Sequence, residues 1–409
     1  MRGSARLLII SSVMALALGG VTASIAPATA QATHPAALFK LTISEIDRDG
    51  TAVKADAFVE STSGVSYLNG GQSVKVPAGR YVVAAGVWRP ADGSTETLVA
   101  DQVHVTGPTH VTLNAQGAIA VDDAIGATGV TQGAQTASVC IGSGIEENEL
   151  AGFLVESPGT VYVKPMASKV LTTVYQTYWV GSSALYEVAG AFKGGIPAHP
   201  DYHGNPATMA AVNVQLRNFE NATPLQAVIE TYDGCGTTTL SPVPLPSSYT
   251  DYRTPGNWNT NLNFAVTSGG TVTRDLYTEG DYKAGHSYTE LFGSAVAGPG
   301  ADYPETDQST IAFSPANQFS DPVIKLGFDC EAKATVTLTR ASVTVAKQKL
   351  TFCGKSEEFS KQVKKTGWYT MTAVANRWNP GGALPARLLS TQVSLAWRFK
   401  FTPVTGHPI

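Results

Sequence analysis

Apolar and polar residues alternate along many short stretches of this chain, which is the pattern of β-strands with one buried face. The clearest stretch lies near the C-terminus, where every second residue is apolar: Val393, Leu395, Trp397, Phe399 and Phe401. The residues between them are Ser394, Ala396, Arg398 and Lys400. A slip of one residue would place the aromatic rings in water, so the pattern predicts a strand of tightly set register.

The same pattern recurs from residue 39 onward. Phe39–Ile46 reads as a strand, and Asp49-Gly50 after it indicates a hairpin turn of type I′, in which both central residues have positive φ. Further strands are predicted at the following places: Val74–Val76, Tyr81–Val87, Leu98–Val105, Thr109–Leu113, Thr160–Val163, Leu171–Trp179, Leu185–Val188, Met209–Leu216, Leu225–Tyr232, Val336–Thr339, Val343–Phe352 and Trp368–Ala375. The longest helix-like stretch is Ser356–Lys365, and it is isolated.

The fold class predicted is therefore all-β, with two or three tandem β-sandwich domains. Two segments suggest where these domains meet. Residues 115–135 are rich in Gly, Ala, Thr and Gln and read as a linker, while Pro242-Val243-Pro244-Leu245-Pro246 removes backbone donors and should stop sheet pairing. The predicted sandwiches are 38–125, 126–245 and 246–409.

The first thirty residues carry the signals of an export leader. Arg2 and Arg6 precede an apolar run, Leu7–Leu18, that is too short for a membrane span, and Ala28-Thr29-Ala30 fits a cleavage site. We expect residues 1–30 to be a signal peptide cleaved near Ala30, residues 31–37 to be a loose leader, and the product to be secreted. No later run is long enough to predict a transmembrane segment.

Four cysteines fit an exported chain with two disulfides. Pairing of nearest neighbours, Cys140 with Cys235 and Cys330 with Cys353, keeps each bridge inside one predicted domain, although three connectivities are possible. A zinc site would need short Cys-x-x-Cys spacings, which the sequence lacks.

Several phrases, in order, resemble the non-catalytic β-rich region that follows the protease domain in secreted subtilisin-like serine peptidases of actinobacteria. They are Leu41–Gly50, Val76–Tyr81, Thr109–Ala115, Tyr252–Trp258, Tyr282–Pro299 and Leu389–Phe399. The turn at Val76–Tyr81 also makes the first unit similar to transthyretin-like or carboxypeptidase-regulatory-like sandwiches. The resemblance implies a binding or accessory role and assigns no place to the four cysteines.

The sequence offers no catalytic triad. His203-Gly204-Asn205 and Thr208-Met209-Ala210 imitate two subtilisin motifs, but they lie too close together in the chain to hold separate roles in that fold. We therefore expect no enzyme activity, no catalytic residues and no cofactor.

Three residues, His199, Asp201 and His203, form a weak candidate for a metal site, although a polar surface loop explains them as well. Trp258 and Trp378 are flanked by Asn, Gly and Pro and could form a platform for a sugar ring, or each could cap a core edge.

A net charge of −4 without a prominent Lys/Arg cluster argues against a nucleic-acid partner. The sequence thus predicts a secreted, non-catalytic protein that binds or scaffolds proteins or the cell-wall or polysaccharide surface. A carbohydrate-binding module is the alternative, and an uncharacterised hydrolase is the second alternative. Oligomeric state is left open.

Overall fold

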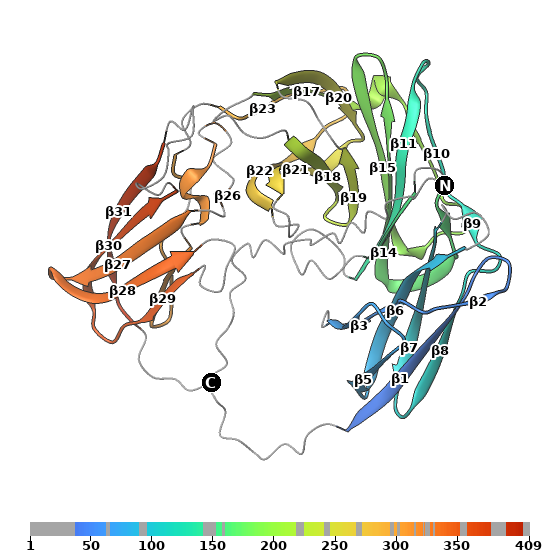
Figure 1. Cartoon of the computed structure of the whole chain (residues 1–409), viewed down its shortest axis with the longest axis horizontal. Coiled ribbons are helices and arrows are strands. Elements are labelled where there is room, and N and C mark those ends of the chain that lie inside the picture. The colour runs from blue at the N-terminus through green and yellow to red at the C-terminus, as the bar shows by residue number, and fades with distance from the viewer. Residues whose placement is uncertain are drawn as a thin grey trace, which may run out of the picture. The chain divides into compact units, whose positions relative to one another are not determined.

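The computed structural model is all-β, as the alternation predicts (Figure 1). It describes residues 37–62, 66–89, 96–141, 153–157, 160–217, 225–240, 246–266, 272–294, 298–300, 303–314, 316–321, 323, 328–329, 332–351, 358–377 and 390–403. Within these ranges the helical elements are two 3₁₀ turns, η1 (Pro206–Thr208) and η2 (Ala316–Phe319). The predicted signal peptide, residues 1–30, lies outside the described residues, as do residues 31–36 of the predicted leader.

The first sandwich is built from two sheets, which we call sheets I and II. Sheet I consists of β2 (Ala52–Val53), β1 (Leu38–Ile46) and β5 (Ser73–Pro77), with β8 (Thr109–Asn114) parallel to β1. Sheet II has the order β4 (Ser66–Asn69), β3 (Phe58–Ser61), β6 (Gly79–Trp88), β7 (Glu96–Val105), β13 (Tyr162–Val163) and β9 (Ile119–Ala120). The core between them contains Leu41, Ile43, Val59, Val83 and Val111, contributed by alternate residues of their strands.

The hairpin predicted at Asp49-Gly50 is confirmed, because β1 pairs antiparallel with β2. The predicted type I′ turn is wrong. Gly50 has a φ of 91°, whereas Asp49 is not among the residues of positive φ. The Asp47 carboxylate instead accepts hydrogen bonds from the backbone N–H of Asp49 and Thr51, at 2.9 and 2.8 Å, and closes the turn from its first residue.

The second sandwich consists of sheets III and IV. Sheet III has the order β12 (Phe153–Ser157), β11 (Thr131–Ile141), β14 (Met166–Val180), β15 (Ala184–Ile196), β20 (Ser247–Arg253), β17 (Ala210–Leu216) and β23 (Ser287–Phe292). Sheet IV has the order β19 (Gly236–Leu240), β18 (Leu225–Tyr232), β21 (Gly256–Val266), β22 (Val272–Tyr282) and β26 (Phe328–Asp329).

The part of sheet III that consists of β11, β14 and β15 is buried on both of its faces. On β14, Leu171 and Tyr175 join a core with Val82 and Leu98 of sheet II, whereas Val174, on the opposite side of the strand, lies near Gly236 of sheet IV. The first two sandwiches therefore share an interior. Two short strands, β10 (Asp122–Ile125) and β16 (Asp201–Gly204), pair in parallel beside this interior.

These pairings correct the predicted domain boundaries. The segment 115–135 is not a free linker, because β9 pairs with β13, and β10 with β16. The boundary near residue 245 is also wrong, because β20 follows it and pairs with β15 and β17 of sheet III. β19 of sheet IV ends at Leu240 and β20 of sheet III begins at Ser247, so the proline-rich segment lies between two strands of one sandwich.

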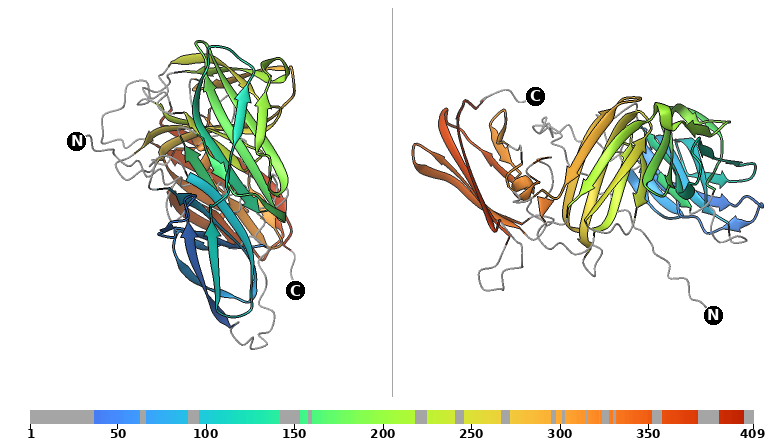
Figure 2. Two further views of the ribbon diagram at one scale, coloured as in Figure 1. Left: turned by 90° about the vertical axis from the view of Figure 1, so that its right-hand side faces the viewer. Right: turned by 90° about the horizontal axis from the view of Figure 1, so that it is seen from above.

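The C-terminal sandwich begins at β24 rather than at residue 246. Sheet V contains β24 (Glu305–Asp307), β25 (Thr310–Phe313) and β29 (Phe359–Gln362). Sheet VI has the order β28 (Val343–Thr351), β27 (Lys333–Arg340), β30 (Gly367–Asn376) and β31 (Gln392–Phe401), whose ribbons run side by side in orange and red (Figure 2). The helix-like stretch Ser356–Lys365 contributes β29, so its helical interpretation is wrong. The predicted strand over 393–401 is confirmed, with Val393 and Phe401 in the core.

One local device recurs in all three sandwiches: an aromatic side chain at a strand start donates a hydrogen bond to the carbonyl four residues earlier. The pairs are Tyr81 with Pro77 at 2.8 Å, Trp258 with Thr254 at 2.7 Å, and Tyr369 with Lys365. A glycine stands two residues before each aromatic: Gly79, Gly256 and Gly367. At Gly256 and Gly367 the φ angles are 146° and 156°, a backbone conformation that other residues rarely adopt. In each case the hydrogen bond from the aromatic side chain fixes the direction in which the chain enters the strand.

Candidate functional site

Trp258 does not form a surface platform. It is 0% exposed, its indole N–H is bonded inside the protein, and its ring lies 4.9 Å from that of Tyr232. The flanking Asn and Gly residues suggested a loop, but β21 begins at Gly256 and its alternation turns Trp258 inward. The predicted sugar platform is therefore wrong for Trp258, and Trp378 lies outside the described residues.

The candidate metal residues are not gathered into a site. His199, Asp201 and His203 are all exposed, and the described residues contain no group of three side chains able to hold a metal ion. Instead the His203 imidazole lies 3.7 Å from the Asp122 carboxylate, across the β10–β16 pair. That contact is a solvent-exposed ion pair when His203 is protonated, and such pairs contribute little to stability.

The disulfide predicted between Cys140 and Cys235 is confirmed. It joins β11 of sheet III to the turn between β18 and β19 of sheet IV, and so ties the two sheets of the second sandwich together. Cys330 and Cys353 lie outside the described residues.

A buried ionic cluster lies between sheets III and IV, where sequence reasoning did not predict one. Arg253 on β20 is 0% exposed. It donates to Asp251 at 2.6 Å and, through two nitrogens, to both carboxylate oxygens of Glu290 on β23, at 3.0 and 3.1 Å. The Tyr282 hydroxyl donates to the same Glu290 carboxylate. The paired geometry makes these the strong, charge-assisted kind of hydrogen bond.

Aromatic rings surround the guanidinium of this cluster. Its central carbon lies 5.1 Å from the ring centre of Tyr282 and 5.8 Å from that of Trp258. Burial raises the pKa of Asp251, while the charge and hydrogen bonds of Arg253 oppose that rise. Since Asp251 and Arg253 are 0% exposed and Glu290 6%, a substrate cannot reach them, and the cluster can act only as an internal brace.

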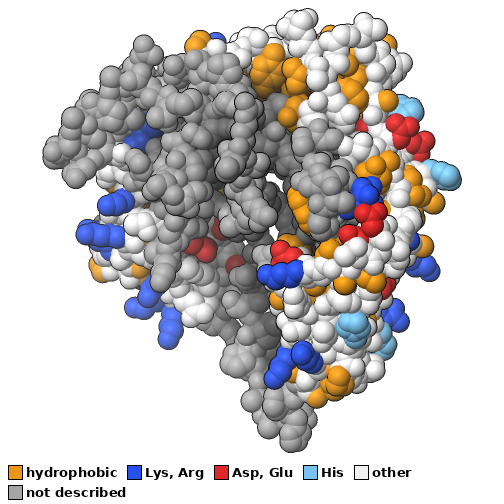
Figure 3. Space-filling view, turned by 45° about the vertical axis from the view of Figure 1, so that its right-hand side comes forward, with side chains coloured by type: hydrophobic (Ala, Val, Ile, Leu, Met, Phe, Trp, Pro, Cys, Tyr) orange, Lys and Arg blue, Asp and Glu red, His pale blue; other side chains and the backbone are white. Residues whose placement is uncertain are grey.

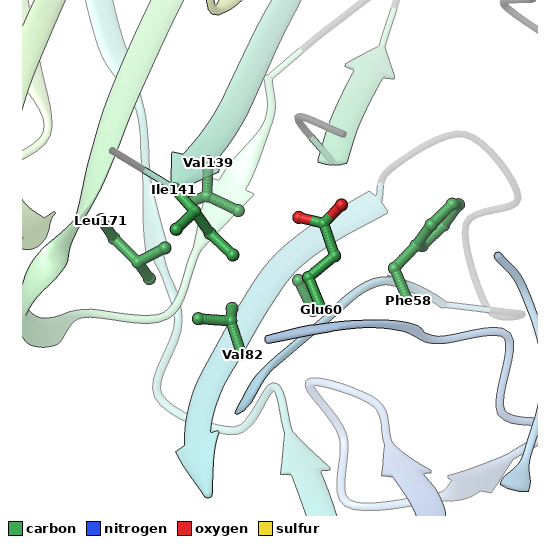
Figure 4. Close-up of a pocket in the computed structure, with 7 residues that line it drawn as sticks. Phe58, Glu60, Val82, Val139, Ile141 and Leu171 are labelled. Carbon is green, nitrogen blue, oxygen red and sulfur yellow. The ribbon is translucent and has the colours of Figure 1, made fainter. Parts of the chain in front are cut away.

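Another buried acid, Glu60, lies in the interior shared by sheets II and III. It projects from β3 and is 5% exposed. Figure 4 shows its carboxylate with Val82 and Ile141 on one side and Phe58 on the other. The cavity beside it has room for about one water molecule, which excludes a sugar ring or a peptide. Burial raises the pKa of Glu60 from 4.5 to about 7.

Asp123 on β10 is also a buried acid. Its carboxylate accepts a hydrogen bond of 2.5 Å from the Thr177 hydroxyl of β14. Burial raises its pKa to about 7, although hydrogen bonds from Thr177 and Gln135 partly oppose this. The sequence signal for these acids is weak, because each is a single carboxylate on a short strand and nothing in the local pattern shows which face of that strand is buried.

The visible face of the molecule shows small groups of apolar side chains interspersed with polar ones (Figure 3). In the described part of the chain, no helix is long and apolar enough to cross a membrane.

Comparison with known proteins leaves the family open. No family model matches the chain, and no curated protein matches it. Among solved structures, the chain is similar to the Bacillus anthracis TIE protein at 11% identity, over 91% of this chain and 65% of that one. The chain thus spans less than two thirds of that protein's length. The TM-score is 0.16, which is too low to establish a common fold.

Proposed function

We propose that this is a secreted, non-catalytic protein that binds or scaffolds at the cell surface or in the medium, or acts there as an accessory to peptidases. The observation that supports this most is the continuous packing of sheets I to IV through three successive cores. Sandwiches that share a core cannot move freely relative to one another, and such rigidity suits a protein that holds binding surfaces at fixed positions. The buried acids described above make contacts inside these cores and do not line an open cleft.

The predicted leader and the Cys140–Cys235 disulfide both favour export, because disulfides persist in oxidising compartments. The order of short phrases shared with the region downstream of subtilisin-like protease domains favours a peptidase-associated role.

Carbohydrate binding is the second candidate, and one observation favours it. Trp368 on β30 is 54% exposed, and the Arg398 guanidinium lies 5.1 Å from its ring centre. An exposed, oriented indole is a suitable surface for stacking on a sugar ring.

Two assays test the proposal. In the first, the purified full chain is sedimented with insoluble cell-wall material and, separately, mixed with a purified subtilisin-like peptidase before gel filtration. Retention or co-elution is the expected result. In the second, casein and fluorogenic peptides are offered as substrates. Cleavage that survives purification and disappears in His203→Ala would refute the non-catalytic proposal.

A further inference from the structure

The outer face of sheet VI has an unusual charge composition. Its four strands, β27, β28, β30 and β31, contain six basic residues and no Asp or Glu. The complete chain has a net charge of −4. Sheet VI therefore carries a local positive charge on a protein that is negative overall.

Strand register places most of these cations on one surface. The inner side of sheet VI carries the core residues Val336, Leu338, Met371 and Ala373, so the alternate residues point outward. We call these the basic face, and its charged members are exposed: Lys333, Lys347, Lys349, Arg398 and Lys400.

Threonines fill the middle of the basic face. Thr337 on β27 lies between Lys347 of β28 and Thr372 of β30, and Thr335 in the next row lies beside Lys349. On the opposite edge strand, Arg398 is next to Thr370 and Lys400 is next to Trp368. Two rows of cations thus flank a hydroxyl stripe, which has an indole at one end.

The dimensions suit an extended polymer. Strands are about 4.8 Å apart and advance about 3.3 Å per residue, so four strands of this length span about 14 Å by about 30 Å. Hydroxyl groups can exchange hydrogen bonds with sugar hydroxyls, the cations can pair with carboxylates, and Trp368 can stack on a ring. The five cations are spaced among hydroxyl side chains, which suits the sparser charge of a carboxylated polysaccharide better than the dense phosphate charge of a nucleic acid.

We propose that the basic face of sheet VI binds an anionic polysaccharide that carries carboxylates. This inference rests on the proposed function and specifies its surface and its partner class. The five cations supply attraction, the threonines and Trp368 supply recognition of the sugar, and the rest of the molecule presents this face.

Isothermal titration of the full chain with polygalacturonate tests the proposal, with neutral dextran and double-stranded DNA as comparisons. The face variant carries Lys347→Gln, Lys349→Gln, Arg398→Gln and Lys400→Gln. The matched control carries an equal change of charge at exposed lysines outside sheet VI: Lys40→Gln, Lys54→Gln, Lys75→Gln and Lys361→Gln.

We expect the wild type and the control to bind polygalacturonate and the face variant to bind about tenfold more weakly or worse, with a smaller dependence on salt. Trp368→Ala should weaken binding while the salt dependence stays unchanged, whereas Trp88→Ala, at an exposed tryptophan of β6, should have no effect. Circular dichroism checks that each variant is folded.

Three results would overturn the proposal: no binding by the wild type, equal losses in the face variant and the control, or tighter binding to DNA than to polygalacturonate. If the lysines only protect the edges of sheet VI, the face variant will self-associate and keep its affinity. A chain that still sediments with cell-wall material or co-elutes with a peptidase would keep the proposed function while this surface fails.

Discussion

Replacing Glu60 with glutamine should remove a pH dependence of stability that the wild type has. The carboxyl group lies in the apolar interior shared by sheets II and III, and its pKa there is about 7, against 4.5 in the unfolded chain. Below pH 4.5 both states hold the proton, and the full stability of that interior is present. As the pH rises, the unfolded chain releases its proton first, so stability falls until about pH 7 and is constant above it.

The size of this effect follows from the two pKa values. Their difference corresponds to about 3 kcal/mol of unfolding free energy lost between pH 4.5 and the plateau above pH 7. Glutamine has nearly the same shape and does not ionise, but burying its amide costs about 1 kcal/mol. We therefore expect Glu60→Gln to be more stable than the wild type by about 2 kcal/mol at pH 8, and slightly less stable at pH 4.5.

Urea denaturation of both proteins, followed by tryptophan fluorescence from pH 4 to pH 8.5, measures the difference. Subtracting the two curves cancels Asp123, whose raised pKa affects both proteins equally. Glu305→Gln, at an exposed position of β24, is the control and should leave the curve unchanged. Parallel curves for the wild type and Glu60→Gln would refute the reasoning, because they would mean that Glu60 is as well solvated in the folded state as in the unfolded chain.

Three further predictions concern the second sandwich and can be checked by urea or thermal denaturation. Arg253→Met should lower the unfolding free energy by about 3–5 kcal/mol, because it leaves Asp251 and Glu290 buried without a cation; a loss below about 1 kcal/mol would contradict the brace. Replacing both Cys140 and Cys235 by serine should cost about 4–5 kcal/mol, given a sequence separation of 95 residues, and an unchanged melting temperature would contradict this. Trp258→Phe should cost about 1–3 kcal/mol through the lost hydrogen bond to Thr254 and the smaller ring; an unchanged denaturation midpoint would count against that contact.

Strands with one buried face could be predicted well from the sequence. The alternation from Val393 to Phe401 matches β31, because a single side of that strand meets a core. The stretch from Tyr81 to Val87 lies within β6, although both faces of β6 are buried. The nearest-neighbour cysteine pairing also placed Cys140 with Cys235 correctly.

Long-range order could not be predicted in the same way. The parallel pairing of β1 with β8 and the return of β20 to sheet III join residues far apart in the chain, and no local pattern specifies such partners. Trp258 follows the same rule: Pro255 and Gly256 are typical turn residues and favour a loop, but β21 begins at Gly256 and buries Trp258.

The basic face could not be predicted from the sequence, because its residues are spaced apart along the chain. Lys347 and Lys349 are separated by one residue, and Arg398 lies almost fifty positions later, so no run of basic residues appears. Only the register of sheet VI places them on one surface. The buried cluster around Arg253 was equally hidden, because its acids come from different strands.

The strands β11, β14 and β15 of sheet III are covered on both sides, which limits where the chain can be cut into independent domains. Cutting the chain after Ala115 would leave the backs of β6 and β7, with Val82, Ala84, Leu98 and Ala100, facing water and prone to aggregation. The first two sandwiches are therefore not independent domains. Recombination that moved one sandwich without the other would expose this apolar face and require many compensating substitutions. We therefore expect the two sandwiches to occur together in related proteins.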